Sequence, residues 1–245
     1  MWAEVKIGKR DVACRREESG VEIGTESRPG GAAVGAVTEE QLRQALLERY
    51  TPRMYEKISR GAAAIAGLGG LGSHIAVMLA RAGVGHLFLV DSDRVEITNL
   101  NRQAYDITHL GQPKTEALAG ILRKINPYIK AEARNITVTE KNAQGLFGEY
   151  PILCEAFDRP EQKAMLVNAV LQGCPHTVVI SGCGMAGYGS ANRIVTQKKM
   201  GRLYVAGDGE TELGPDTCLM ASRVMVCAAH QANMAIRLLL GEEKP

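Results

Sequence analysis

The chain has 245 residues, of which 45% are hydrophobic and 23% charged, so it is long enough for one large α/β domain or two small ones and is not a disordered protein. Its 29 Lys and Arg residues nearly balance its 27 Asp and Glu residues, and the formal net charge of +2 excludes a general attraction to nucleic acid or to an anionic membrane. Aromatic residues make up only 4%, whereas glycine occurs 27 times, which argues against an all-β sandwich and favours tight strand-to-helix turns.

Residues 1–37 are rich in charged residues, Gly, Ala and Pro, and cannot build a core, so we predict a flexible N-terminal arm. A single domain is predicted to follow at residues 38–245. Its first helix begins at Thr38, which precedes two acidic residues as a helix N-cap does, and apolar residues at helical spacing continue it to about Tyr50.

A βαβ unit is predicted next. Residues 62–66 form a short apolar run that stops at a glycine-rich turn, an apolar helix follows to about residue 82, and residues 86–90 form a second buried strand. The unit has the length of about 30 residues that is typical of a nucleotide-binding βαβ motif.

Helices and strands go on alternating towards the C-terminus. Two late runs alternate like antiparallel strands, and a long helix follows and stops at Gly241 as at a C-cap. The pattern predicts an α/β fold: a Rossmann-like βαβ nucleotide-binding half that continues into a mixed sheet with antiparallel C-terminal strands and a long C-terminal helix. Helices are predicted at residues 114–125, 140–147, 161–171 and 220–240, and strands at residues 131–138, 151–156, 177–181, 192–196 and 202–206.

The six cysteines indicate in which cellular compartment the protein works and whether it binds a structural metal. None of them pairs as Cys-x-x-Cys, so we expect no structural zinc. The first residues carry charges where a signal peptide would be apolar, and no apolar run approaches the roughly 20 residues that cross a bilayer. We expect a cytoplasmic protein with reduced thiols and no membrane partner. The cysteines are Cys14, Cys154, Cys174, Cys183, Cys218 and Cys227.

A glycine triplet lies between the first predicted strand of the βαβ unit and its helix. Gly67 permits a tight turn, Gly69 lets a phosphate approach the backbone, and Gly72 lets helix and strand pack closely. The helix N-terminus offers free N–H groups to an anion. Asp91 ends the second strand about 20 residues after the last glycine, where a carboxylate binds ribose hydroxyls. These residues predict a nucleotide site.

The segment after Asp91 is more polar than a covering loop requires. Arg102 and Lys114 can bring two positive charges to a triphosphate, and Asn99 and Gln103 can hydrogen-bond phosphate oxygens. An NAD-dependent dehydrogenase would leave these side chains without a task, so the segment favours a nucleoside triphosphate.

The motifs AGLGGLGS, VDSDRVEITNLNRQ, GQPK and INP together resemble the adenylating domain of the ubiquitin-activating-enzyme superfamily, which includes the ThiF and MoeB proteins of thiamine and molybdopterin synthesis. The resemblance runs from about residue 49 to residue 241. EAFDRPEQKAMLVN and SGCGMAGYGSAN are most similar to the short bacterial form of ThiF, which adenylates the sulfur carrier ThiS.

The resemblance implies a role for each candidate residue. The glycine turn would cradle ATP, Asp91 would hold the ribose, and Asp158 would serve Mg²⁺ and the attacking carboxyl group. The other subunit of a homodimer would lend an arginine, for which Arg53 is preferred to Arg49. Asp158 also suits the N-cap of the next helix. Arg102, Lys114, Asp158 and Arg53 would act in catalysis, and the nucleotide ligands would be Gly67, Gly69, Gly70, Gly72, Asp91, Asp93, Asn99, Arg102, Gln103 and Lys114.

The chain departs from the longer ThiF and MoeB forms at its cysteines. Their zinc-binding Cys-x-x-Cys pairs are absent, and Gly214 occupies the position of their acceptor cysteine. Cys218 is displaced from that position, and we expect a buried, unreactive thiol there, with Cys154 and Cys227 in the core. The glycine-rich residues 182–189 are interpreted as a flexible crossover that shapes a channel for an extended diglycine tail.

The expected function is that of an ATP- and Mg²⁺-dependent nucleotidyltransferase. It would activate the C-terminal glycine of a small ubiquitin-like sulfur carrier, ThiS-like and ending in Gly-Gly, as an acyl-adenylate with release of pyrophosphate, in thiamine thiazole biosynthesis. A sulfur donor such as a cysteine desulfurase would use the product, and nucleic acid is not an expected partner. The alternatives are a tRNA threonylcarbamoyladenosine dehydratase-like enzyme, an NAD-dependent dehydrogenase, and a non-catalytic regulatory protein that binds nucleotide or carrier.

Overall fold

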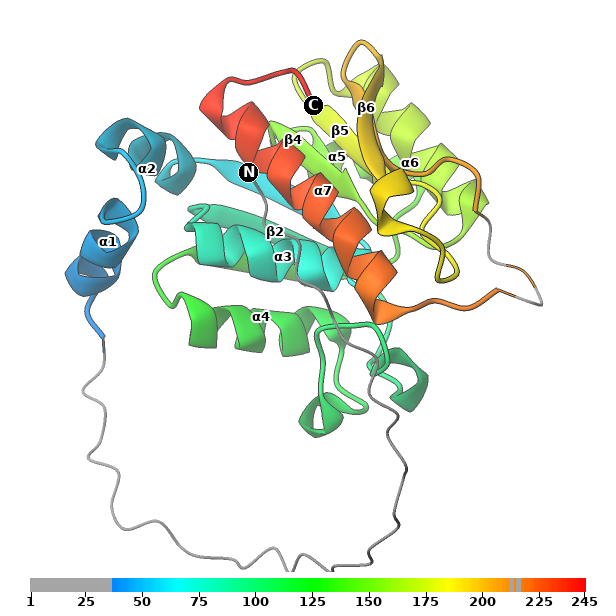
Figure 1. Ribbon diagram of the computed structural model, residues 1–245, viewed down its shortest axis with the longest axis horizontal. Helices are drawn as coiled ribbons and strands as arrows, with labels where there is room; N and C mark the ends of the chain where they lie inside the picture. Colours follow the sequence, from blue (N-terminus) through cyan, green and yellow to red (C-terminus); the bar gives the residue numbers. More distant parts are fainter. Residues whose placement is uncertain (1–36, 212–213, 215–216) are drawn as a thin grey trace, which may run out of the picture. The chain divides into compact units, whose positions relative to one another are not determined.

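The computed structural model describes residues 37–211, 214 and 217–245, and a seven-stranded sheet lies at the centre of this part of the chain (Figure 1). Of the predicted N-terminal arm, residues 1–37, only Val37 is among the described residues, so the prediction of that arm falls outside them. The strands are β1 (Ala62–Ala66), β2 (His86–Asp91), β3 (Lys130–Asn135), β4 (Ile152–Glu155), β5 (Val178–Gly182), β6 (Val195–Met200) and β7 (Leu203–Gly207). The helices are α1 (Glu39–Leu47), α2 (Pro52–Ser59), α3 (Gly70–Ala82), α4 (Lys114–Ile125), α5 (Glu140–Phe147), α6 (Pro160–Gly173) and α7 (Ala221–Leu240).

The order of the strands fixes where a ligand can bind. The order is β3-β2-β1-β4-β5-β7-β6, and neighbouring strands are parallel except for the antiparallel pair β6 and β7. The predicted α/β fold, with its antiparallel C-terminal strands and long C-terminal helix, is therefore confirmed. The order reverses between β1 and β4, and ligands of such sheets bind in the crevice at the carboxyl ends of the strands at that point.

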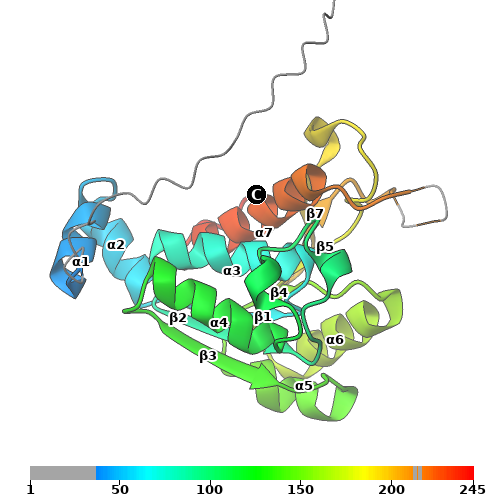
Figure 2. The same ribbon diagram turned by 90° about the horizontal axis from the view of Figure 1, so that it is seen from below.

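Helices cover both faces of the sheet (Figure 2): α3, α4 and α7 pack on one face, and α5 and α6 pack on the other. The pleat of β1 divides its side chains between the two layers. Ala63 and Ile65 join the core under α3 and α7, whereas Ala64 and Ala66 join the core with α5 and α6. Because the strand is buried on both faces, it is a continuous apolar run, as is typical of a central parallel strand.

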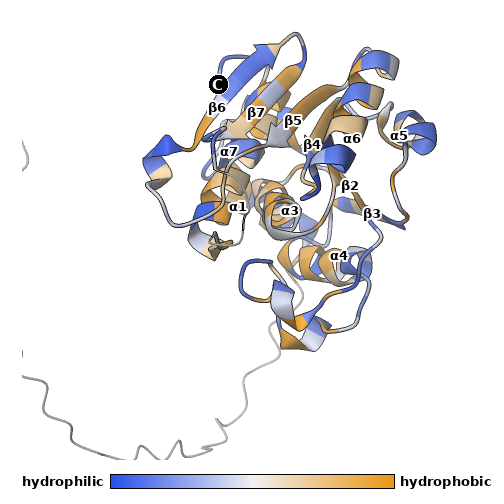
Figure 3. Ribbon diagram, turned by 90° about the vertical axis from the view of Figure 1, so that its right-hand side faces the viewer, coloured by the Kyte–Doolittle hydropathy of each residue, from blue (hydrophilic) through white to orange (hydrophobic). Residues whose placement is uncertain are grey.

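The outer strand β6 is hydrophilic (blue in Figure 3), in contrast to the hydrophobic central strands. Its Lys198 and Lys199 are exposed, and lysines on an edge strand discourage pairing with another chain. The strand begins at Val195, later than predicted, because Ala191–Arg193 form a 3₁₀ turn.

The predicted first helix, residues 38–50, is α1, and a second helix that was not predicted follows it. Thr38 caps α1 as predicted, but α1 ends at Leu47 and α2 begins at Pro52. The hydroxyl of Thr51 accepts a hydrogen bond of 3.3 Å from the Met54 amide, and Pro52 occupies the first helical position, where no N–H is needed. The first helix is therefore confirmed with an earlier end, and α2 was not predicted although Thr51 and Pro52 are local signals of a helix start.

α7 packs along α3 and ends at Gly241, whose φ of +92° is the left-handed conformation predicted for a C-cap. No helix in the described ranges is both long enough and apolar enough to cross a membrane.

Candidate nucleotide-binding site

The glycine turn between β1 and α3 lies at the carboxyl ends of β1, β2 and β4. Gly67 has a φ of +86°, and its amide donates a hydrogen bond of 2.9 Å to the carbonyl oxygen of Val90. A Cβ atom at Gly72 would overlap the carbonyl oxygen of Gly67. The N-cap of α3 is Gly69, which has no side chain to occupy the first amides of the helix. The turn therefore presents open backbone N–H groups at the crevice, as a phosphate site requires.

Asp91 fastens this turn to the end of β2. Its Oδ2 atom accepts a hydrogen bond of 2.6 Å from the Leu68 amide, and its Oδ1 atom accepts one of 2.7 Å from the Asp93 amide. The residue is 9% exposed. Each carboxylate oxygen has a further lone pair, so Asp91 can hold the turn and still accept a hydrogen bond from a ribose hydroxyl.

Lys114 lies at the first position of α4 and is almost fully buried. Its Nζ atom lies 2.8 Å from Oδ2 of Asp93, whose side chain is largely exposed. The Tyr105 hydroxyl donates a hydrogen bond of 2.8 Å to the Leu68 carbonyl oxygen and lies 3.4 Å from the Lys114 carbonyl oxygen. Burial, and after it the charge of Asp91, raises the pKa of Tyr105, so the hydroxyl stays protonated and joins the glycine turn to α4.

The first turn of α3 holds the segment that carries Arg102 and Gln103. The Oγ atom of Ser73 accepts a hydrogen bond of 3.1 Å from the Ala104 amide, and Nε2 of His74 donates one of 3.1 Å to the Arg102 carbonyl oxygen. Burial lowers the pKa of His74. The Gln103 side chain is buried over the glycine turn, and its Oε1 atom has no hydrogen-bond partner among the described residues. Since buried polar atoms are nearly always paired, this atom fits a site that a ligand completes.

Asn99 and Arg102 are engaged within their own loop. The Oδ1 atom of Asn99 accepts a hydrogen bond of 3.1 Å from the Glu96 amide and caps a 3₁₀ turn. The Nη1 atom of Arg102 donates hydrogen bonds of 2.9 Å to the Thr98 carbonyl oxygen and to Oδ1 of Asn101. The stem of Arg102 packs beside Gly70, so its charge is next to the turn but directed away from it.

Asp158 follows β4 and is exposed, and its carboxylate has no hydrogen-bond or ion-pair partner within the described ranges. The prediction that Asp158 caps α6 is wrong, because Arg159 is the N-cap residue. Pro160 takes the first helical position and forces the residue before it into an extended conformation, which moves the helix start beyond Asp158.

Glu155 is a polar residue of the site that the sequence did not single out. It is fully buried at the end of β4, and its Oε1 atom accepts a hydrogen bond of 2.7 Å from the Phe157 amide. Its Oε2 atom accepts hydrogen bonds of 2.6 Å from Nζ of Lys163 and from Oγ of Ser181. These bonds fix the turn that carries Asp158. The available signal was a carboxylate at the end of an apolar run, with a lysine on the next helix to neutralise it.

The structure does not bring Arg53 to this crevice. Arg49 and Arg53 are both exposed, and α2 packs against the far end of α7, where Nζ of Lys57 donates a hydrogen bond of 2.5 Å to the Leu240 carbonyl oxygen. The other end of α7 touches the glycine turn, because a Cβ at Gly70 would lie 3.0 Å from the Val224 side chain. Arg53, on α2, therefore lies at the opposite end of α7 from the site.

The cysteines divide by burial. Cys154 and Cys227 are buried as predicted, and burial raises the pKa of each thiol to about 12. The prediction of a buried Cys218 is wrong: this residue is exposed and precedes α7, which begins only at Ala221. The described residues contain no group of three or more His, Cys, Asp or Glu side chains that could hold a metal ion.

Comparison with known proteins matches residues 41–245 to the ThiF family. The chain is 30% identical over 216 residues to the molybdopterin-synthase adenylyltransferase of Escherichia coli K12, and the alignment covers 83% of this chain and 82% of that protein. It is 34% identical over 144 residues to the sulfur carrier protein adenylyltransferase of Thermus thermophilus, which covers 56% of this chain and 53% of that protein. The match thus spans about half of that relative, and 31% of the maize adenylyltransferase and sulfurtransferase MOCS3-1.

A solved structure of Escherichia coli tRNA N6-threonylcarbamoyladenosine dehydratase, TcdA, in complex with ATP has a similar fold. The TM-score is 0.75 at 19% identity, and the match covers 84% of this chain and 97% of that one. At this identity the likeness establishes the fold alone. The family match covers most of the chain and agrees with the strand order and the glycine turn, so the chain belongs to the ThiF family.

Proposed function

We propose that this chain adenylates the C-terminal carboxylate of a small ubiquitin-like sulfur carrier protein that ends in Gly-Gly. The substrates are ATP with Mg²⁺ and a ThiS-like carrier, and the products are the carrier acyl-adenylate and pyrophosphate. A sulfur donor such as a cysteine desulfurase then acts on the acyl-adenylate, which gives the chain a place in thiamine thiazole synthesis. The adenylyltransferase names of its relatives support this class of reaction.

The observation that carries the proposal is the group of polar residues around one crevice. Gly67 and Gly69 form an open turn, Asp91 and the buried Lys114 flank it, and Gln103 covers it with an Oε1 atom that has no hydrogen-bond partner in the described part of the chain. A dinucleotide site needs the glycine turn and the carboxylate of Asp91, but a dinucleotide does not require a buried lysine such as Lys114 beside the turn. A triphosphate gives that lysine a partner.

The reaction joins two anions, so it depends on neutralising charge. A carboxylate oxygen of the carrier attacks the α-phosphorus of ATP, the bond from that phosphorus to the bridging oxygen breaks, and pyrophosphate leaves with the electron pair. Lys114 exchanges Asp93 for phosphate oxygens, and Arg102 turns from its own loop towards the leaving group. Asp158 would hold Mg²⁺, which would supply further charge neutralisation.

The chain acts as a homodimer in this proposal. Arg53 is exposed on α2, which packs against the end of α7 that is remote from the crevice of the same chain. Its side chain is therefore available to the crevice of a second copy.

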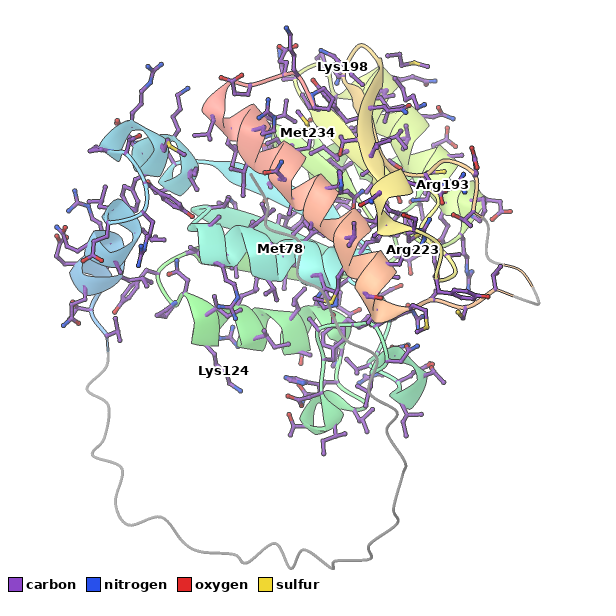
Figure 4. The ribbon with its side chains drawn as sticks, viewed as in Figure 1. Met78, Lys124, Arg193, Lys198, Arg223 and Met234 are labelled. Atoms are coloured by element: carbon purple, nitrogen blue, oxygen red, sulfur yellow. The ribbon has the colours of Figure 1, made fainter. Side chains whose placement is uncertain are left out.

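ATP–pyrophosphate exchange tests the proposal. Exchange should depend on a ThiS-like carrier ending in Gly-Gly, and Lys114→Ala should lower its rate by about 10²- to 10³-fold. Lys124→Ala is the matched control, because Lys124 is an exposed lysine on the same helix (Figure 4) and should leave the rate unchanged. Thermal unfolding of both variants separates a chemical effect from loss of fold.

Other outcomes would assign the chain elsewhere. Exchange that requires tRNA and ignores the carrier would indicate a tRNA threonylcarbamoyladenosine dehydratase-like enzyme. ATP binding without exchange under any condition would indicate a regulatory protein. A folded Lys114→Ala protein with full activity would refute the site.

A further inference from the structure

Two loops after β5 and β7, residues 183–190 and 207–211, are held together by one buried arginine. Arg223, in the first turn of α7, is 3% exposed. Its Nε atom donates a hydrogen bond of 3.1 Å to the Ala186 carbonyl oxygen, and its Nη1 atom donates hydrogen bonds of 2.7 Å to the carbonyl oxygens of Gly189 and Ser190. Arg223 thus binds the loop of residues 183–190 on both sides of its tip, where Tyr188 is 87% exposed.

The remaining nitrogen of Arg223, Nη2, pairs with Asp208 in the second loop, and the side chain of Asp208 is equally buried. Oδ1 of Asp208 accepts hydrogen bonds of 2.9 Å from the amides of Glu210 and Thr211, and Oδ2 accepts one from the Thr211 hydroxyl. Burial by itself would raise the pKa of Asp208, but these hydrogen bonds and the charge of Arg223 hold it well below the usual range. The carboxylate therefore stays ionised and keeps its turn closed.

The two loops touch backbone to backbone. The Asp208 amide donates a hydrogen bond of 2.9 Å to the Gly184 carbonyl oxygen, and a Cβ at Gly184 would lie 2.6 Å from the Gly209 nitrogen. A Cβ at Gly207 would lie 2.5 Å from the Cys183 carbonyl carbon. Glycines at positions 184 and 207 permit this close approach, and Arg223 adds side-chain hydrogen bonds to the backbone hydrogen bonds that join the two loops.

This clamp adjoins the proposed nucleotide site. Val224, the residue after Arg223, lies against Gly70 of the glycine turn. Nδ2 of Asn101 donates a hydrogen bond of 3.3 Å to the Leu219 carbonyl oxygen just before α7. The loops held by Arg223 thus lie on the side of β5 and β7, next to the glycine turn and to the loop that carries Asn101.

The chemistry of the Arg223–Asp208 pair indicates that the pair fixes the positions of the two loops. The ion pair by itself adds little net stability, because desolvation of two charges offsets much of their attraction. An arginine that binds three carbonyl oxygens of one loop and a carboxylate of the other fixes both loops in definite positions, which the planar guanidinium does and a lysine ammonium does not. An extended diglycine tail needs a channel of defined width, since it has no side chains with which to adapt.

We propose that Arg223 and Asp208 are positioning residues: they hold the loops of residues 183–190 and 207–211 as the channel along which the carrier's diglycine tail reaches ATP. This inference rests on the proposed function. Neither residue touches the reacting atoms, so the pair should govern how well the carrier binds and how its tail is aligned, and it should leave ATP binding nearly unchanged.

The test compares Arg223→Lys with the parent protein and with Arg193→Gln. Arg193, just after the first loop, pairs with Glu210 of the second loop, but both side chains are exposed, so Arg193 is the matched control (Figure 4). Arg223→Lys should raise the KM for a ThiS-like carrier by about ten- to hundredfold. The KM for ATP should stay within about twofold, since Lys keeps the charge. Amide hydrogen exchange should rise in both loops. Arg193→Gln should change none of these.

Asp208→Asn is the milder second variant. It keeps the size of the side chain and an acceptor for the Glu210 and Thr211 amides, and it removes the charge and the acceptor that face Nη2 of Arg223, so it stays informative if Arg223→Lys does not fold. Loops as protected in the variants as in the parent would refute the clamp, whatever the reaction. A parent protein without carrier-dependent exchange would refute the proposed function. A parent that exchanges, with variants whose carrier KM is unchanged, would refute the positioning role alone.

Discussion

Replacing single glycines of the turn separates packing from ligand binding. At Gly72 an added Cβ would overlap the carbonyl oxygen of Gly67 and lie 2.9 Å from its carbonyl carbon, where ordinary contacts begin at 3.4 Å. The obstacle is backbone, which cannot rotate aside as a side chain does. At Gly69 the nearest atom to an added Cβ is Nε2 of Gln103 at 3.7 Å, so an alanine fits.

The two substitutions should therefore have opposite signatures. Gly72→Ala should cost about 3 kcal/mol, the upper part of the range for overpacking, because α3 must move away from β1. For a chain of this size that corresponds to a fall in Tm of about 6–12 °C. Gly69→Ala should change stability by less than about 0.5 kcal/mol. Its methyl group would stand where a phosphate approaches the backbone, so the KM for ATP should rise about tenfold.

Thermal unfolding by circular dichroism and the ATP dependence of pyrophosphate exchange measure the two effects. Gly145→Ala on α5 is the control, since an added Cβ there meets no atom within 4 Å and should stabilise the exposed helix by about 0.5–1 kcal/mol. A Gly72→Ala protein with the Tm of the parent would refute the packing argument. A Gly69→Ala protein with unchanged ATP dependence would refute the assignment of that position to the phosphate.

Three further predictions concern residues outside the crevice. Arg202 donates hydrogen bonds to three carbonyl oxygens around the end of α6, so Arg202→Ala should lower the free energy of unfolding by about 2 kcal/mol in urea titrations without changing the KM for ATP. At pH 8 the exposed Cys183 and Cys218 should react with a thiol reagent in the folded protein. The buried thiols of Cys154 and Cys227, whose pKa values are raised to about 12, should react only after unfolding. The Cys218→Ala variant should keep pyrophosphate exchange, and loss of exchange in a folded variant would show that this thiol takes part in the reaction.

Much of the fold and part of the site follow from the sequence. The βαβ unit was predictable because its signals are local: an apolar run, glycines at fixed spacing, a helical apolar pattern and a carboxylate at the end of the next strand. Asp91 lies at the predicted place and binds the Leu68 amide, although only the structure gives that contact. Helix α2 was not predicted, although Thr51 and Pro52 are local signals of its start.

The sequence by itself determined the type of sheet, the glycine turn and the polar segment around Lys114, since each depends on neighbours within about 30 residues. The tertiary structure decided which distant groups meet: Glu155 with Lys163 and Ser181, and Arg223 with Asp208. It also decided that Cys218 is exposed. The physical reason is that a buried charge needs a partner of opposite charge or a hydrogen-bonding group. The order of the strands in the sheet, and not the distance along the sequence, determines which residue is that partner.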